Sequence, residues 1–461
     1  MMPTFKVISP NNNRSYAERT YATNAEIELA LKKSLSAQHE WRNTPVEVRK
    51  KFCLKAVSAL LARQSSIAEE LSWQMGRPLR YTPDEIKGFA ERARHMARIA
   101  ADKLTDIEIE RSTESTKLIR RTPHGIVFSI VPWNYPYLTA VNVIIPALMA
   151  GNSVIMKPSS QTPLTAERLF EAFDTAGLPS GLFQYLFLDH PSTVKLIQND
   201  AINYVSFTGS TQGGRDIEAA AVGRFIDIGL ELGGKDPAYV RHDAELEHTV
   251  ENLIDGAFFN SGQSCCGIER IYVHKELYQK FCDNFIELTR EYRLGDPLHP
   301  DTTLGPMVNA TAATRVRDQI SDAIKQGATP TIDEKRFTAS KAGTAYLAPQ
   351  VLLNVDHSMS VMRDESFGPV VGIMSVDSDE QAIKLMNDSP YGLTASIWTT
   401  DQESALNIGN QLETGTCFMN RCDYLNPALA WSGVKNSGKG CSLSELAYER
   451  LTQPKSFYFR N

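Results

Sequence analysis

Short apolar runs alternate with helical segments between residues 125 and 240, and this alternation restricts the fold more than any other feature of the chain. The segment at 165–176 has helical spacing and ends at Gly177 and Pro179, which stop helices. Alternation of this kind is typical of a parallel sheet with helices on both faces. We therefore predict an open α/β sheet that binds ligands at the carboxyl ends of its strands. The runs that we interpret as strands lie at 126–131, 153–156, 183–188 and 202–207.

The rest of the chain predicts a second α/β domain and a protruding arm. Residues 24–100 carry apolar side chains at helical spacing, and strands and helices alternate again from about 234 to 430. Residues 107–121 alternate like strands, and the tail at 456–460 is an aromatic strand that needs a sheet to join. Such an arm more often pairs with another subunit than lies in a core, so we expect a homodimer or homotetramer. The expected parts are a first domain at 1–103 and 124–233, a second at 234–436, and an arm with its tail strand at 104–123 and 452–461.

Charge and composition exclude several classes of function. The net charge is −6 over 461 residues, so we expect no nucleic-acid partner and no anionic membrane surface. Arg92, Arg94 and Arg98 form the densest basic cluster, and their spacing favours the solvated face of a helix. The longest apolar stretch, 141–151, is interrupted and too short to span a bilayer. The N-terminus lacks the apolar core of a signal peptide, so we expect a cytoplasmic location.

The seven cysteines show no disulfide framework. Their number is odd and their spacing is irregular, as in proteins of reducing compartments. The sequence has no CxxC pair and no HExxH motif, and its nine histidines do not cluster. We therefore expect neither a structural nor a catalytic metal.

A cysteine and a glutamate carry the clearest chemical signal. Cys265 follows a turn of small residues at 262–264, and Glu231 lies between two leucines ahead of Gly233 and Gly234. A lone cysteine is usually a small buried hydrophobe, and a lone glutamate is usually solvated. Here backbone amides on the turn would stabilise a thiolate, and apolar neighbours would raise the pKa of Glu231 towards that of a general base. The two groups suit covalent catalysis with a hydrolytic second step.

Four further segments are weak signals when taken singly. The glycine-rich turn at 207–215 would bind an anion at a helix N-terminus, but it matches neither GxGxxG nor a P-loop, and an ordinary turn fits as well. Asn134, between two prolines, would donate to an oxyanion, although a structural turn asparagine is the more common role. Lys157 at a strand end suits a ribose or phosphate, or is a surface lysine. The carboxylate and ring at 364–369 would hold a sugar hydroxyl, or form a turn beside a core phenylalanine.

The order of these segments resembles the NAD(P)-dependent aldehyde dehydrogenase superfamily. The matching segments span almost the whole chain, and their joint order and spacing are specific although each is weak alone. The resemblance implies a Rossmann-like cofactor-binding domain, a second α/β catalytic domain and a small β oligomerisation arm. The segments lie at 132–134, 157–158, 207–211, 231–235, 262–265, 365–369, 387–393 and 432–438.

The resemblance implies a role for each matching residue. Cys265 would be the nucleophile and Glu231 the general base, while Asn134 and the backbone amide of Cys265 would form the oxyanion hole. Ser160 stands where many NAD-preferring relatives have a glutamate, which would repel a 2′-phosphate, so we expect the enzyme to accept NADP+. The cofactor, NADP or NAD, would contact Ile130, Pro132, Trp133, Lys157, Ser160, Gly209, Ser210, Gly214, Leu232, Glu365 and Phe367.

The implied reaction oxidises an aldehyde to its carboxylic acid through a cysteine thiohemiacetal and a thioester. The implied tunnel is mixed aromatic and aliphatic, which favours a medium aliphatic or aromatic aldehyde. A semialdehyde is the alternative: relatives acting on succinic semialdehyde tend to have arginine in place of Asn142, but Arg421 would offer a cation from another wall. A structural relative without turnover and acyl transfer to coenzyme A also stay open, although the presence of Glu231 favours hydrolysis. The implied tunnel residues are Tyr135, Leu138, Asn142, Phe259, Phe367, Arg421 and Leu425.

Overall fold

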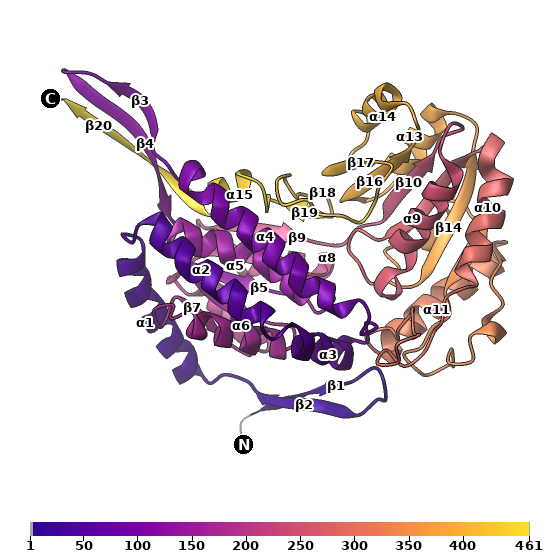
Figure 1. The fold of residues 1–461 in the computed structure, drawn as a ribbon, viewed down its shortest axis with the longest axis horizontal. Helices are drawn as coiled ribbons and strands as arrows, with labels where there is room; N and C mark the ends of the chain where they lie inside the picture. The colour runs from indigo at the N-terminus through magenta and orange to yellow at the C-terminus, as the bar shows by residue number, and fades with distance from the viewer. Residues whose placement is uncertain (1–2, 461) are drawn as a thin grey trace.

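Two lobes and a projecting arm form the molecule, as the computed structural model shows for residues 3–460 (Figure 1). Each lobe is built on one mixed sheet with its helices. The chain passes from the first lobe to the second after residue 231 and returns near its end, where the short strand β19 (Gly438–Lys439) pairs with the first sheet. Segments from both halves of the sequence therefore meet between the lobes.

The first lobe contains a six-stranded sheet in the order β19-β9-β8-β5-β6-β7. Five of its strands run parallel, and β19 is antiparallel to β9. All residues of β5 are buried, as expected for a strand with both faces covered. The α/β sheet predicted from the apolar runs is thus confirmed. Its parallel strands are β5 (Ile126–Ile130), β6 (Ser153–Lys157), β7 (Phe183–Tyr185), β8 (Ile202–Thr208) and β9 (Asp227–Glu231).

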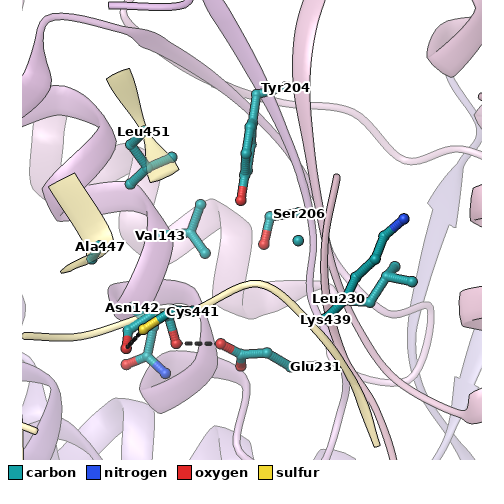
Figure 2. A pocket seen from close by; sticks show the side chains of 12 residues that line it. Asn142, Val143, Tyr204, Ser206, Leu230, Glu231, Lys439, Cys441, Ala447 and Leu451 are labelled. Atoms are coloured by element: carbon teal, nitrogen blue, oxygen red, sulfur yellow. Dashed lines mark hydrogen bonds between the residues drawn. The ribbon is translucent and has the colours of Figure 1, made fainter. Parts of the chain in front are cut away.

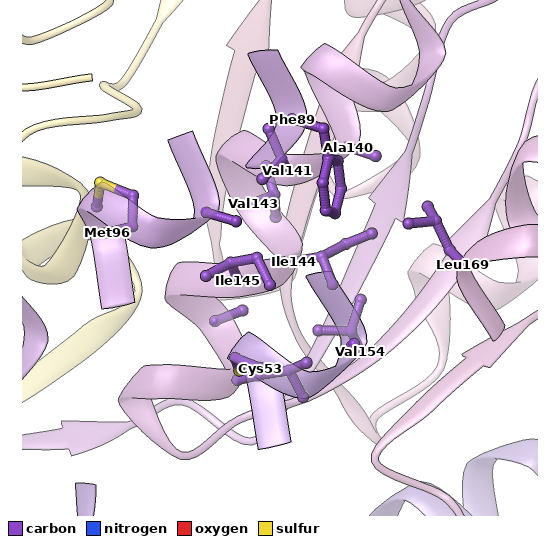
Figure 3. Close-up of a cluster of buried hydrophobic side chains, with 14 of the residues drawn as sticks. Cys53, Phe89, Met96, Ala140, Val141, Val143, Ile144, Ile145, Val154 and Leu169 are labelled. Atoms are coloured by element: carbon purple, nitrogen blue, oxygen red, sulfur yellow. The ribbon is translucent and has the colours of Figure 1, made fainter. Parts of the chain in front are cut away.

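The helices of the first lobe share one hydrophobic core with this sheet. Phe89 of α4, Ile144 of α5 and Leu169 of α6 lie around Val154 of β6 (Figure 3). None of the helices in residues 3–460 is long and apolar enough to cross a membrane. The helices of this lobe are α1 (Asn24–Trp41), α2 (Val46–Leu61), α3 (Gln64–Met75), α4 (Thr82–Lys103), α5 (Pro136–Ala150), α6 (Leu164–Thr175), α7 (His190–Gln198), α8 (Thr211–Ala220) and α15 (Leu446–Arg450).

The second lobe contains a seven-stranded sheet in the order β12-β13-β14-β11-β10-β16-β17. Its strands run parallel except β12, which is antiparallel to β13. The strands are β10 (Asp236–Val240), β11 (Ile268–His274), β12 (Thr329–Pro330), β13 (Gln350–Leu353), β14 (Val370–Val376), β16 (Thr394–Trp398) and β17 (Thr416–Met419). The helices are α9 (Leu246–Phe258), α10 (Lys275–Thr289), α11 (Ala310–Lys325), α12 (Ser360–Arg363), α13 (Asp379–Asn387) and α14 (Gln402–Gly409).

The arm is a three-stranded antiparallel sheet in the order β20-β4-β3. Its strands are β3 (Ile107–Arg111), β4 (Ser115–Pro123) and β20 (Thr452–Arg460). Tyr458 and Phe459 on the outer strand β20 are exposed, and residue 461 of the predicted tail lies outside the described residues. Two small pairs complete the fold: the hairpin of β1 (Thr4–Ile8) with β2 (Ser15–Thr20), and β15 (Tyr391–Gly392) with β18 (Val434–Lys435).

The prediction that all three clustered arginines face solvent is wrong for one of them. Arg94 and Arg98 are exposed on α4, but Arg92 is only 9% exposed and lies against α5. At 3.6 residues per turn, Arg92 lies roughly 120–160° around the helix from the other two. The cluster therefore spans two faces of the helix, and only one of them meets water.

Candidate active site

The carboxyl ends of parallel strands bring the predicted segments of the first lobe to one edge of its sheet. β5 ends just before the turn that carries Asn134, β6 ends at Lys157, β8 ends at Thr208 and β9 ends at Glu231. Because these strands are parallel neighbours, the four residues gather at the same edge despite their separation along the chain. This is the edge at which open α/β sheets bind ligands.

Cys265 lies on a strained loop between α9 and β11 of the second lobe. Asn260 and Ser261 have φ of 53° and 57°, a left-handed backbone that residues other than glycine rarely adopt. The Cys265 side chain is partly exposed and packs against the core of the first lobe. A Cβ on Gly234 would lie 2.4 Å from the Cys265 carbonyl oxygen, so glycine is required where the turn after β9 meets this loop. The nucleophile candidate of one lobe thus lies beside the turn that follows Glu231 of the other.

The Asn134 side chain connects the first lobe to the same loop. It is buried, and its Nδ2 donates to the carbonyl oxygen of Gln263 at 3.2 Å. Gln263 is two residues before Cys265. An amide nitrogen carries two hydrogens, so one N–H of Asn134 remains to bind an oxyanion.

A buried ion pair fixes the turn that carries Asn134. The Arg77 guanidinium pairs with the Glu85 carboxylate at 2.5 Å, and both side chains are almost fully buried. Arg77 also donates to the backbone carbonyl oxygen of Asn134 and, at 3.2 Å, to Oδ1 of Asn260. Glu85 accepts from the backbone N–H of Tyr137 at 2.8 Å. The pair therefore ties α4, the start of α5 and the strained loop together.

The Glu231 carboxyl lies beside a small cavity with both polar and apolar lining residues (Figure 2). Burial raises the pKa of Glu231 above its ordinary value. Ser442 donates a hydrogen bond to Oε1, and Thr208 donates to Oε2 at 3.4 Å. The cavity, also lined by Asn142 and Cys441, offers about 20 Å³ to the centre of a water molecule, which is room for one. A carboxyl with a raised pKa next to water-sized space is suited to act as a general base.

The thiol of Cys266, the residue next to Cys265, already donates a hydrogen bond within the protein. Its Sγ donates to Oδ1 of Asp423 at 2.8 Å, and Ser264 donates to the same oxygen at 3.1 Å. A hydrogen bond with Cys265 and burial raise the pKa of Cys266. Burial also raises the pKa of Asp423 to about 7. Cys266 is therefore buried and held as a donor, whereas Cys265 is the more accessible thiol.

A helix N-terminus at the sheet edge fits a pyrophosphate. Ser210 caps α8 by accepting from the backbone N–H of Gly213 at 3.1 Å, and the backbone N–H of Gly209 donates to the Glu231 carbonyl oxygen at 3.0 Å. A Cβ on Gly214 would lie 2.6 Å from the Leu232 side chain, so this glycine lets α8 pack closely on the strand. Amides at a helix N-terminus bind anions.

A buried carboxyl and two aromatic rings fit the rest of a dinucleotide. Glu365 accepts from the backbone N–H of Gly234 at 3.0 Å, and burial raises its pKa to about 7. Trp133 and Phe367 meet edge to face, with ring centroids 5.7 Å apart. These residues fit the needs of a dinucleotide: the Glu365 carboxyl would bind sugar hydroxyls, and the two aromatic rings offer apolar surfaces to its rings. The remaining predicted cofactor residues differ in exposure: Ile130 is buried, Pro132 and Lys157 are half-buried, and Ser160 is exposed.

The predicted tunnel residues come from both lobes. Tyr135 precedes α5, and its hydroxyl is buried without a hydrogen-bond partner among residues 3–460. Phe259 packs against Tyr81 with ring centroids 5.2 Å apart, and Leu425 packs with Cys265 against the first core. Arg421 is exposed, and its guanidinium lies 3.4 Å from the centroid of the Tyr424 ring. Leu138 and Asn142 follow on α5, where both accept hydrogen bonds from Arg92.

Several residues of the site gave no signal in the sequence. Arg77 and Glu85 are eight residues apart, which matches no helical contact spacing, and Ser442 follows the last motif without belonging to it. Asp423 belongs to no motif, and Arg92 was interpreted as part of the solvated face of a helix. Their partners come from distant segments, so only the three-dimensional packing reveals them.

The fold and the residues at the sheet edge fit one class of protein, the α/β enzymes that bind a dinucleotide. Comparison with known proteins narrows the class. Residues 2–457 match the model of the aldehyde dehydrogenase family, and the chain belongs to this family. It is an NAD(P)-dependent aldehyde dehydrogenase.

Relatives and solved structures agree with this assignment. A 3-sulfolactaldehyde dehydrogenase of Priestia aryabhattai is 33% identical over 98% of this chain and 94% of its own length. The succinic semialdehyde dehydrogenase of Streptococcus pyogenes, solved with NADP+, is 28% identical with a TM-score of 0.94 over 99% of this chain and 100% of that one. The betaine aldehyde dehydrogenase of Staphylococcus aureus, solved with NAD+, is 28% identical with a TM-score of 0.93 over 99% of this chain and 91% of that one.

Proposed function

We propose that this enzyme oxidises an aldehyde to its carboxylic acid with Cys265 as the nucleophile, through a thiohemiacetal and then a thioester. One observation carries the proposal. The loop with Cys265 contacts both the Asn134 side chain and the turn that follows Glu231, and these contacts between two lobes support the proposal.

Each residue has a defined task. The Cys265 thiolate attacks the aldehyde carbon, and Asn134 Nδ2 with the Cys265 backbone N–H binds the oxyanion that forms. When bound, NAD(P)+ supplies the acceptor for the hydride that leaves this carbon. Glu231 then takes a proton from a water whose oxygen attacks the thioester carbonyl carbon, and the acid leaves as the thiolate is restored. The residues that would hold the cofactor are Trp133, Lys157, Ser160, Gly209, Ser210, Glu365 and Phe367.

The proposed substrate is a medium aliphatic or aromatic aldehyde, with a semialdehyde as the second candidate. The second candidate is supported by the names of similar proteins, which include a succinic semialdehyde dehydrogenase and a 3-sulfolactaldehyde dehydrogenase. A panel of aldehydes assayed with NAD+ and NADP+ tests the proposal, and the absence of NAD(P)H formation with every aldehyde would refute it.

Replacing the base is expected to separate the two half-reactions. In Glu231→Gln the first half-reaction proceeds, but water is no longer activated, so steady-state kcat falls about 10²- to 10⁴-fold. Stopped-flow absorbance should show a burst of about one NAD(P)H per site, and mass spectrometry should find the acyl group on the peptide with Cys265.

The pH dependence of this step follows from the raised pKa of Glu231. Only the ionised carboxyl accepts a proton, so thioester hydrolysis slows as pH falls through a pKa above the ordinary glutamate value. The wild-type enzyme shows this limb in single-turnover hydrolysis, and Glu231→Gln lacks it. The assignment of Glu231 as the base would be contradicted if Glu231→Gln showed no burst of NAD(P)H and its hydrolysis rate still fell with pH as in the wild type.

We propose that the enzyme accepts NADP+ because Ser160 places no negative charge where a 2′-phosphate would bind. Ser160→Glu adds that charge, and the ratio of kcat/KM for NADP+ to that for NAD+ is expected to fall by about tenfold or more. Ser160→Ala is the control, since it removes the hydroxyl without adding charge. A strong preference of the wild-type enzyme for NAD+ would contradict this expectation.

We propose that the arm pairs between subunits, giving a homodimer or homotetramer. The support is the exposed aromatic surface of β20 at Tyr458 and Phe459, together with the outer edges of the sheet, which pair with no other strand of residues 3–460. This assembly and the cytoplasmic location stay predictions.

A further inference from the structure

Lys235 and Glu269 form an ion pair in the interior of the protein. Lys235 lies where the chain enters the second lobe, just before β10, and its Nζ donates to Oε2 of Glu269 on β11. The exposed fractions of the two side chains are 0% and 5%. A buried pair contributes little net stability, because the loss of hydration of both charges offsets their attraction. Neither residue has a task in the reaction proposed above, so the contacts of the pair indicate its role.

The Glu269 carboxylate holds the backbone of the segment at 365–367. Its Oε2 accepts a hydrogen bond from the backbone N–H of Ser366 at 2.8 Å, and its Oε1 accepts from the backbone N–H of Phe367 at 2.9 Å. Lys235 adds a hydrogen bond from Nζ to Oγ of Ser366 at 3.0 Å. Hydrogen bonds to a charged group are stronger than those between neutral groups, so the pair fixes this segment firmly.

The backbone that Glu269 holds is strained. Phe367 has a φ of 52°, a left-handed conformation that is unfavourable for a bulky side chain. Such a conformation persists only where surrounding contacts impose it, and here Glu269 binds the N–H of the same residue. The conformation sets the direction of the Phe367 ring, which meets Trp133 edge to face.

Glu365, the residue before Ser366, is fixed by the same group of contacts. Its Oε1 accepts from the backbone N–H of Gly234, the neighbour of Lys235, at 3.0 Å. Burial raises the pKa of Glu365 to about 7, and the charge of Glu269 adds to this rise, whereas the charge of Lys235 opposes it. Lys235 thus favours the ionised carboxylate, which is the stronger acceptor for sugar hydroxyls.

We propose that the Lys235–Glu269 pair positions the cofactor site, because it holds the segment at 365–367 in the arrangement that binds NAD(P)+. The inference rests on the cofactor contacts proposed above for Glu365 and Phe367, and it adds two residues that act through them. The pair should therefore control the affinity for the cofactor.

Binding of NADPH and NADH in the absence of aldehyde tests the proposal. Titration followed by cofactor fluorescence gives the dissociation constant, and urea unfolding gives the stability of the same variants. Glu269→Gln is expected to raise the dissociation constant by about tenfold to a hundredfold. The reason is that glutamine replaces one accepting oxygen with an NH2 group, which would face a donor.

A double variant separates this effect from a loss of stability. Glu269→Gln leaves the Lys235 charge buried without its partner, so the variant should also unfold at a lower urea concentration. Lys235→Met with Glu269→Leu leaves no buried charge and should recover much of that stability. Its dissociation constant should stay as high as that of Glu269→Gln, because the N–H groups of the segment still lack their acceptor.

A second double variant tests whether the pair acts through Glu365. Glu365→Gln alone should weaken cofactor binding. Adding Glu269→Gln to this variant should raise the dissociation constant by a smaller factor than it does in the wild type, because two changes that remove the same contact are not additive.

Asp379→Asn is the matched control. Asp379 pairs with Arg241 at 3.0 Å, and Arg241 follows β10 at the opposite end of this strand from Lys235. The change breaks an ion pair of the same lobe roughly 20 Å along the strand from Lys235. Its dissociation constants for NADPH and NADH should equal those of the wild type.

Two results would overturn the inference. The first is a Glu269→Gln protein or a Lys235→Met, Glu269→Leu protein that binds both cofactors as tightly as Asp379→Asn does. The second is a Glu365→Gln protein that binds like the wild type, or one in which Glu269→Gln has its full effect. Failure of the proposed function looks different, since then Cys265→Ala still oxidises aldehydes while cofactor binding responds to Glu269→Gln.

Discussion

Cys265→Ala is expected to lose at least about 10⁴-fold in kcat with every aldehyde and with both cofactors, because removal of a nucleophile leaves only the contribution of binding and oxyanion stabilisation. The folded structure should persist, since the thiol is partly exposed and the substitution removes one atom. Absorbance of NAD(P)H at steady state and in single turnover measures the loss, and circular dichroism checks the fold.

Cys266→Ala is the matched control for this experiment. It removes a thiol one residue away, but that thiol donates to Asp423 and is not placed to attack a substrate. We expect kcat within about tenfold of the wild type, because one buried hydrogen bond contributes about 1 kcal/mol. If instead Cys266→Ala abolished turnover and Cys265→Ala retained it, the nucleophile would have to be reassigned.

Arg77→Met is expected to destabilise the protein by about 3–5 kcal/mol, since it leaves the Glu85 carboxylate buried without its partner. It should also lower kcat, because Arg77 holds the Asn134 carbonyl and the Asn260 side chain in place. Urea unfolding followed by fluorescence measures the first effect, and aldehyde oxidation measures the second.

A double substitution and a change in an exposed ion pair test whether the unpaired Glu85 carboxylate causes the loss of stability. Arg77→Met with Glu85→Leu should be less destabilised than the sum of the single changes, because no buried charge remains. Lys87→Met breaks an exposed pair with Asp84 on the same helix and should change the free energy of unfolding by less than about 1 kcal/mol. An Arg77→Met protein as stable as Lys87→Met would refute the role of the buried pair.

The predictions that the structure confirms were based on patterns of neighbouring residues in the sequence. The strands predicted at 126–131 and 153–156, which the structure has at 126–130 and 153–157, were visible because an apolar run is a property of neighbouring residues. The two sheets followed from the alternation of such runs with helices. The leucine neighbours of Glu231 predicted a raised pKa, and burial does raise the pKa of this carboxyl, while its role as the general base stays a prediction.

Pairings between distant segments were not visible. Ser442 meets Glu231 across 211 residues, and Asp423 meets Cys266 across 157. Such contacts depend on how distant segments of the same lobe fold together, and no local period encodes them. Arg92 is a different case, because its spacing from Phe89 and Met96 does place it on the buried face of α4, and the interpretation of the basic cluster overlooked that spacing.

The division of the site between two lobes has a consequence for the life of the molecule. Cys265 belongs to the second lobe, whereas Glu231 and Asn134 belong to the first. In the mechanism proposed above, a chain whose two lobes have formed but have not yet packed together would therefore be inactive.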